Sequence, residues 1–212
     1  MRFFSLKSMV LAMGLVAAVC AAQAEYLWVE PASAATAGKA RVYLGELEGA
    51  KRLPTHSVAS ARIFLADEKD LPLTTEADFY AAAVTGAGDL RATARRVGED
   101  GSITFFQAKL GRSETKAVND LELVPVTSGG NIFQLVFKGR KVSATQVNVQ
   151  TSDGWRRVLR PLEDGTVSIA TPFAGLYVLE VSAKVGGLPT IVDGKKFDDV
   201  RHTATISFEV PK

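Results

Sequence analysis

Two histidines are the side chains of this sequence best suited to metal binding or proton transfer. His202 closely follows Asp198 and Asp199 in "FDDVRH", whereas His56 stands in the polar stretch "LPTHSVAS". One imidazole with neighbouring carboxylates can hold a divalent ion weakly. The alternative for His202 is a hydrogen-bonded residue at the rim of a core, and for His56 a solvated loop position. The spacing therefore predicts a weak metal site at His202, Asp198 and Asp199, and none at His56.

Catalytic motifs are missing from the sequence. It contains no G-x-S-x-G, no H-E-x-x-H, no C-x-x-C and no Gly-rich phosphate loop. A Ser-His-Asp triad or a carboxylate pair assembled from distant positions stays open, because such sites are recognised by geometry and not by spacing. We expect a protein that is not an enzyme. An envelope interaction module is the second interpretation, and a hydrolase is the third.

Residues 1–24 have the three parts of a secretory signal. Arg2 and Lys7 precede an apolar run, and Ala22-Gln23-Ala24 is an A-x-A cleavage site. The apolar run is shorter than the roughly 20 residues that a spanning helix needs. We therefore expect cleavage before Glu25 and no membrane insertion afterwards.

An exported protein of this kind can be soluble or anchored by a lipid. A lipid anchor at Cys20 would need a small residue before it, and Val19 stands there. We expect a soluble mature protein in the periplasm, with secretion as the alternative.

Removal of the signal also changes the charge and the redox chemistry. The full chain has 25 basic and 23 acidic residues, and the signal contains two of the basic ones. The mature chain therefore has no net charge, which argues against nucleic acid as a partner. The single cysteine, Cys20, leaves with the signal. The mature protein is expected to have neither disulfides nor thiol chemistry.

Alternating strands dominate the mature chain and predict a mainly all-β fold. "DLRATARRV" and "SITFFQAKL" flank the turn at 98–101 and indicate a hairpin. In "VRHTATISFEVP" the residues His202, Ala204, Ile206 and Phe208 share one face. One segment departs from this pattern, because "TTEADFYAAAV" at 74–84 has a capping pattern and predicts a short helix.

The chain is expected to contain two β-sandwich-like units with at most that one short helix. The first unit covers residues 25–119 and the second residues 120–212, because the sequence pattern changes near Asn119, where "NDLELVPV" precedes the turn "TSGGN". At least six strands follow in the second unit, as in a β-sandwich. The stretch "GGLPTIVDGKKFDD" is expected to be a loop with a turn at Asp193-Gly194.

Several stretches together resemble a known family. "YLWVEP", "LELVPV", "FKGRKVSATQVNV", "DGTVSIATPFAGLYVLEV" and "HTATISFEVP" are similar to the periplasmic domain-of-unknown-function 4198 family. Its NikM-like members are associated with nickel or cobalt uptake. The resemblance covers nearly the whole mature chain, and the second half also resembles transthyretin-like or CnaB-like sandwiches.

The resemblance implies a metal-uptake accessory protein, with one departure. The family pattern begins with a histidine three residues before the aromatic residue, and here Glu25 takes that place before Trp28. The implied ligand set becomes Glu25 with His202, Asp198 and Asp199, for a divalent ion such as nickel, cobalt or copper, with no certain cofactor. The implied partners are an inner-membrane transporter or an outer-membrane receptor. The interaction-module interpretation replaces the metal by a glycan or a protein.

Overall fold

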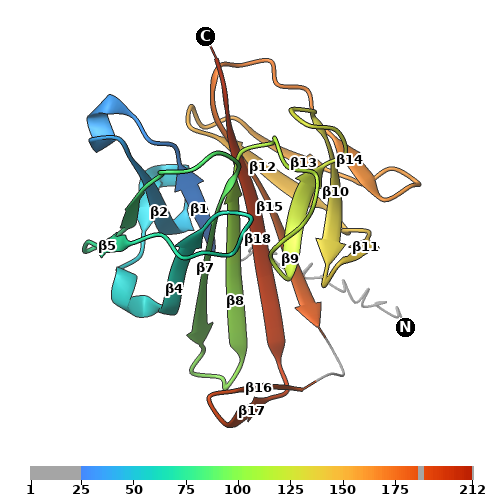
Figure 1. Ribbon diagram of the computed structural model, residues 1–212. Coiled ribbons are helices and arrows are strands. Elements are labelled where there is room, and N and C mark those ends of the chain that lie inside the picture. The colour runs from blue at the N-terminus through green and yellow to red at the C-terminus, as the bar shows by residue number, and fades with distance from the viewer. Residues whose placement is uncertain (1–24, 186–188, 212) are drawn as a thin grey trace, which may run out of the picture.

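The computed structural model describes residues 25–185 and 189–211, and in them the protein is almost entirely β (Figure 1). The all-β expectation is confirmed. Within the described residues, helical structure is limited to three single turns of 3-10 helix. The expected signal, residues 1–24, lies outside the described residues. The turns are η1 (Ala34–Thr36), η2 (Glu48–Ala50) and η3 (Thr55–Ser57).

A seven-stranded sheet forms the middle of the molecule (Figure 1). Its order is β13-β12-β15-β18-β8-β7-β4, and β18 pairs with β8 in parallel but with β15 antiparallel. The strands are β4 (Ala59–Phe64), β7 (Leu90–Val97), β8 (Ile103–Leu110), β12 (Val147–Thr151), β13 (Arg156–Leu159), β15 (Gly175–Val185) and β18 (Val200–Val210).

Two smaller sheets lie on either side of this central sheet in Figure 1. The first has the order β1-β2-β6-β5, with β3 also paired to β2, and the second has β10 between β9 and the short strands β11 and β14. The first contains β1 (Tyr26–Glu30), β2 (Lys39–Glu46), β3 (Lys51–Arg52), β5 (Leu73–Thr75) and β6 (Tyr80–Ala83). The second contains β9 (Leu121–Pro125), β10 (Ile132–Phe137), β11 (Arg140–Val142) and β14 (Thr166–Ser168).

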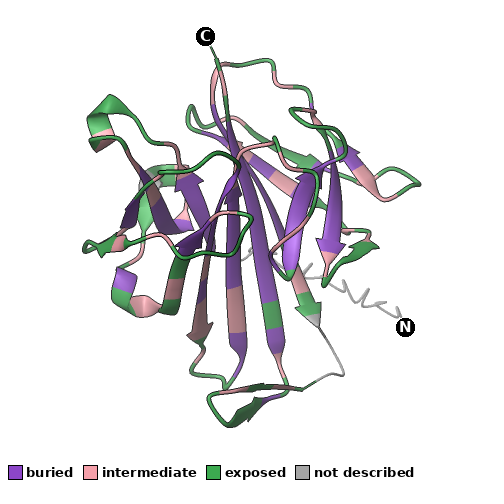
Figure 2. Ribbon diagram, viewed as in Figure 1, coloured by how far each residue is buried: buried purple, intermediate pink, exposed green. Residues whose placement is uncertain are grey.

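Strand β18 is buried on both faces, as Figure 2 shows for the centre of the sheet. Its apolar face packs into a core with β9 and β10, as the alternation predicted. Its other face is made of hydroxyl side chains that are also buried. The apolar face carries Ala204, Ile206 and Phe208, and the hydroxyl face carries Thr203, Thr205 and Ser207.

The two expected units each have a core of their own but share the central sheet. The largest core contains only residues after position 120, and the second only residues before position 111. Strands β4, β7 and β8 come from the first unit, whereas β12, β13, β15 and β18 come from the second. The boundary near 119 therefore marks a change of core within one continuous sheet.

The helix predicted at 74–84 is wrong, because this segment forms the hairpin of β5 and β6. Tyr80 and Ala82 point into the core, and the Tyr80 hydroxyl donates to the carbonyl of Thr55 at 2.8 Å. Ala82 lies opposite Ala40 of β2, and both side chains are buried in the same core. Tertiary packing thus overrides the local helix preference of the alanines.

The loop predicted between 186 and 199 also contains a hairpin. Its strands are β16 (Thr190–Val192) and β17 (Lys195–Phe197), at the lower end of Figure 1. The expected turn at Asp193-Gly194 is present, with φ of 50° and 77°. Positive φ at both central residues is the geometry that a two-residue hairpin turn requires, and Asp-Gly suits it.

Candidate functional site

Strand β1 directly follows Glu25, and its outer edge is hydrogen-bonded to the central sheet. β1 is the end strand of its sheet, and its free edge faces β18. The Thr205 hydroxyl donates to the Leu27 carbonyl at 2.6 Å, and the Val29 amide donates to the Ser207 hydroxyl at 3.4 Å. These bonds satisfy edge groups that would otherwise be unpaired, which explains the buried hydroxyl face of β18.

Trp28 fixes the same strand from the other side. The side chain is fully buried, and its ring stacks on Tyr43 with 5.2 Å between the ring centroids. It also shares a small core with Leu176 and Val178 of β15. Trp28 therefore anchors β1 in the interior of the protein.

Glu25, immediately before β1, lines a pocket of about 380 Å3 on this side of the central sheet. We call it the N-terminal pocket. The Glu25 carboxylate forms an ion pair with Arg96 of β7. Polar and charged side chains make up most of the remaining wall, namely Thr104, Ser182, Lys184, Arg201 and Thr203.

The two other cations of the pocket share one carboxylate. Asp199 lies 2.8 Å from Lys184 and 3.3 Å from Arg201, which also contacts Asp100 at 3.3 Å. Hydrogen bonds from Lys184 and then Arg201 lower the pKa of Asp199. The Asp199 carboxylate therefore stays ionised and is paired with the side chains of Lys184 and Arg201. Its predicted companion Asp198 pairs with Lys196 at 2.9 Å.

His202 borders the pocket, but its ring contacts lie on the opposite face of the sheet. The ring stacks on Phe105 and meets the edge of Phe137, with centroid distances of 5.1 and 5.2 Å. Gln107 accepts the Leu121 amide at 2.5 Å with its carbonyl oxygen, so its amino group donates to His202 Nδ1 at 3.0 Å. That bond leaves the imidazole proton on Nε2. Burial lowers the pKa of His202, and the ring is neutral at physiological pH.

The four predicted metal ligands do not meet at one point. Glu25 is engaged by Arg96, His202 by Gln107, and the two aspartates by lysine and arginine. Among residues 25–185 and 189–211, no three His, Cys, Asp or Glu side chains are grouped in a way that fits a metal ion. The donor set therefore does not fit the transition-metal site that the family resemblance implies. His56 is exposed in η3, as expected for a solvated loop position.

Sequence reasoning missed a buried ionic cluster, which we define as Asp89, Arg91, Lys109, Glu114 and Glu122. Arg91 and Lys109 lie directly opposite each other on β7 and β8, and both are fully buried. Two like charges in register repel unless anions lie between them. Arg91 contacts Glu114 at 2.6 Å and Glu122 at 3.0 Å, and Lys109 contacts Asp89 at 3.1 Å.

The ionic cluster fixes the position of residues 113–119, the segment that joins the two units. Glu122 accepts the amides of Val118 and Asn119, and Asp89 accepts the amides of Ser113 and Glu114. Each charge is thus paired and hydrogen-bonded, which a buried charge requires. Its only sequence signal was the pair of cations at matching hairpin positions, a pattern equally typical of a solvated face.

No protein-family model matches the chain, and no curated protein matches it significantly. Within the described residues, none of the helical segments has the length and apolar character needed to cross a membrane.

Proposed function

We propose that the protein is an exported, non-enzymatic binding or accessory protein of the cell envelope, and that the N-terminal pocket contacts its ligand. The observation that carries this proposal is that Glu25, expected to be the first residue after signal cleavage, lines that pocket. Cleavage there would add a free α-amine beside its carboxylate. The strand that follows is anchored by Trp28 and Thr205, so these groups would be held in place.

The resemblance to NikM-like proteins supports a link to nickel or cobalt uptake, with an inner-membrane transporter or an outer-membrane receptor as the partner. The Arg96 contact of Glu25 weighs against tight metal binding by this chain. Carboxylate oxygen also suits nickel and copper less well than imidazole does. We therefore propose an accessory role in which this chain binds nickel or copper weakly or not at all.

Calorimetry on the mature protein tests this proposal. Titration with nickel and with copper should show weak binding or none, and Glu25→His should raise the affinity for both ions. Glu25→Gln is the matched control, because it keeps the size of the side chain and removes its charge without adding an imidazole. Tight binding by the native protein that survives Glu25→Gln would contradict the proposal.

The second candidate function is an interaction module for a glycan or a protein. One observation favours it: Phe173, about 46% exposed, lies edge-on to Trp155 with 5.8 Å between the ring centroids. Trp155 itself is partly buried and packs against the largest core. If Glu25→His leaves metal affinity unchanged, this candidate leads. Loss of glycan binding in Phe173→Ala would support it.

A further inference from the structure

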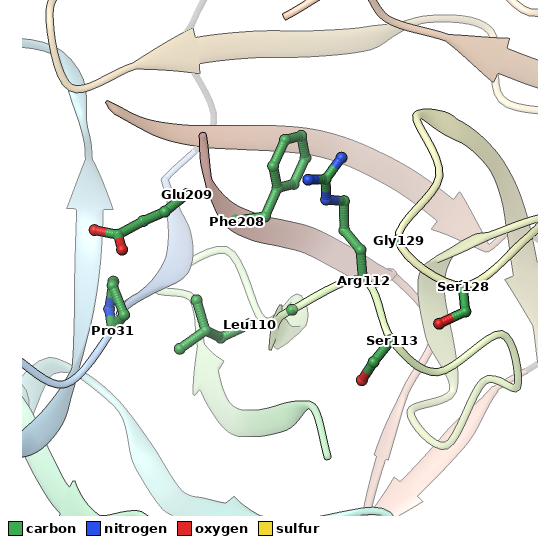
Figure 3. A pocket seen from close by; sticks show the side chains of 9 residues that line it. Pro31, Leu110, Arg112, Ser113, Ser128, Gly129, Phe208 and Glu209 are labelled. Carbon is green, nitrogen blue, oxygen red and sulfur yellow. The ribbon is translucent and has the colours of Figure 1, made fainter. Parts of the chain in front are cut away.

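A second pocket, of about 370 Å3, opens where the ends of β8 and β18 meet the 126–131 turn (Figure 3). We call it the Arg112 pocket. Arg112 and Phe208 form one part of its wall, Ser128 another, and Pro31 and Leu110 an apolar part. It shares no lining residue with the N-terminal pocket.

The Arg112 guanidinium is held in a fixed orientation. It lies over the Phe208 ring, 4.1 Å from the ring centroid, and Nη1 donates to Asn131 Oδ1. The Gly129 amide donates to the Arg112 carbonyl at 2.7 Å, which ties the 126–131 turn to the same residue. A planar guanidinium that is stacked and hydrogen-bonded on one side presents its remaining N–H groups as a rigid fork.

Arg112 has no acidic partner at ion-pair distance among residues 25–185 and 189–211. At least one such partner is present for each of Arg91, Arg95, Arg96 and Arg201. The side chain is nevertheless half-buried. Desolvation lowers the pKa of Arg112, and no opposing carboxylate offsets it. A half-buried charge of this kind is stabilised when an anion binds to it.

The other polar groups of the pocket leave the guanidinium accessible. Glu209 lines the pocket, but its carboxylate points away from Arg112 on the far side of Phe208 (Figure 3). The Ser113 hydroxyl donates to Asp89 at 2.5 Å and is already used. The exposed Ser128 hydroxyl lies on the side of the Arg112 stem and can donate to a ligand.

We propose that the Arg112 pocket binds a small organic oxyanion, with a carboxylate or phosphate group on the guanidinium fork and a short apolar part against Pro31 and Leu110. Two oxygens of one carboxylate or phosphate group match the paired N–H donors of arginine. The site goes beyond the proposed function, because it requires neither a metal nor the mature N-terminus.

An NMR titration of the mature protein with succinate, inorganic phosphate and chloride, at matched ionic strength, tests the proposal. We expect saturable shifts of the Arg112 Nε–H, Ser128 and Gly129 signals with succinate or phosphate. Chloride should give none. Succinate alone, phosphate alone or both would identify the preferred oxyanion, whereas equal responses to all three would overturn the proposal.

Two variants separate recognition from general charge effects. Arg112→Gln should weaken binding about tenfold or more, since it removes a charge-assisted pair of hydrogen bonds. Arg95→Gln, which removes a half-buried arginine paired with the exposed Asp193, should leave binding unchanged. If Arg112→Gln fails to fold, Ser128→Glu provides the test, because a carboxylate at the rim should compete with the ligand. Unchanged binding in a folded Arg112→Gln or in Ser128→Glu would overturn the proposal.

Discussion

The hydroxyl of Thr205 in β18 donates a hydrogen bond to the carbonyl oxygen of Leu27 in β1, although 178 positions separate the two residues. Both groups are buried, and the oxygen–oxygen distance is 2.6 Å. The bond joins the first and the last strand of the described residues. It therefore connects the segment next to Glu25 with the centre of the seven-stranded sheet.

Thr205→Val should destabilise the protein by about 1–3 kcal/mol, because the Leu27 carbonyl would remain buried without a donor. The substitution preserves the shape of the side chain, so packing changes little. Urea unfolding followed by Trp fluorescence measures the effect. Thr127→Val is the control, since Thr127 is exposed in a turn, and it should change the free energy of unfolding little. Equal effects of the two substitutions would show that the hydroxyl does not act through this bond.

Lys109→Met should be among the most destabilising single substitutions, at about 3–5 kcal/mol, because it leaves Asp89 and Glu122 short of a buried cation. Lys138→Met is matched in chemistry but affects an exposed ion pair with Asp120, and its effect should be small. The same urea unfolding measures both. A small loss for Lys109→Met would mean that water enters the ionic cluster and solvates its acids.

The ionic cluster also predicts how stability changes with acid. Burial opposes ionisation of Asp89, but hydrogen bonds from Ser113 and Glu114 and the charge of Lys109 outweigh it and lower the pKa of Asp89. A carboxylate with a lowered folded-state pKa stabilises the protein above its unfolded-state value of 3.8. That contribution is lost as the pH falls below 3.8 and through the folded-state pKa.

Asp89→Asn should therefore reduce the acid-induced loss of unfolding free energy relative to the native protein, while lowering stability at neutral pH. Asp153→Asn is the control, because Asp153 is exposed in a turn, and its curve should run parallel to that of the native protein. Chemical unfolding at a series of pH values gives the two curves. Parallel curves for the native protein and Asp89→Asn would contradict the prediction.

Much of the fold follows from alternation in the sequence, whereas its long-range assembly does not. The hairpin of β7 and β8 and the apolar face of β18 were predicted because side chains alternate across a strand. The helix at 74–84 was wrong because the environment of Tyr80 and Ala82 comes from β2, which a local window cannot include. The parallel pairing of β8 with β18 likewise joins distant residues that no local pattern connects.

The candidate site was only partly predictable for the same reason. His202 was singled out by residue type and Glu25 by the family resemblance, and both border the N-terminal pocket. Arg96, whose guanidinium pairs with the Glu25 carboxylate, lies 71 positions away in the sequence. No local sequence pattern could therefore predict this ion pair. Alternation placed Arg91 on the face opposite Leu90 and Ala92 but could not show that β9 and the segment before it cover that face.

The burial of His202 predicts a titration below its ordinary value of 6.5. Desolvation is the largest cause and lowers the pKa, Asp120 raises it, and Lys138 lowers it. Between the folded and unfolded values the unfolded chain binds more protons, so stability rises with pH across that window. Proton NMR of the imidazole, assigned by comparison with His202→Gln, measures the value directly. A pKa at or above 6.5 would show that the ring is hydrated or paired with Asp120.

Export predicts the chemical identity of the chain's first residue. If the signal is cleaved after Ala24, the protein purified from its native cells should have the mass of residues 25–212, with a free α-amine on Glu25 beside Arg96. Intact-protein mass spectrometry measures this. Ala22→Lys should block cleavage, because the A-x-A site needs small residues, and should leave the full-length precursor at the membrane. A native mass that retains residues 1–24, or an acyl group on Cys20, would contradict the proposed export and remove the α-amine from the N-terminal pocket.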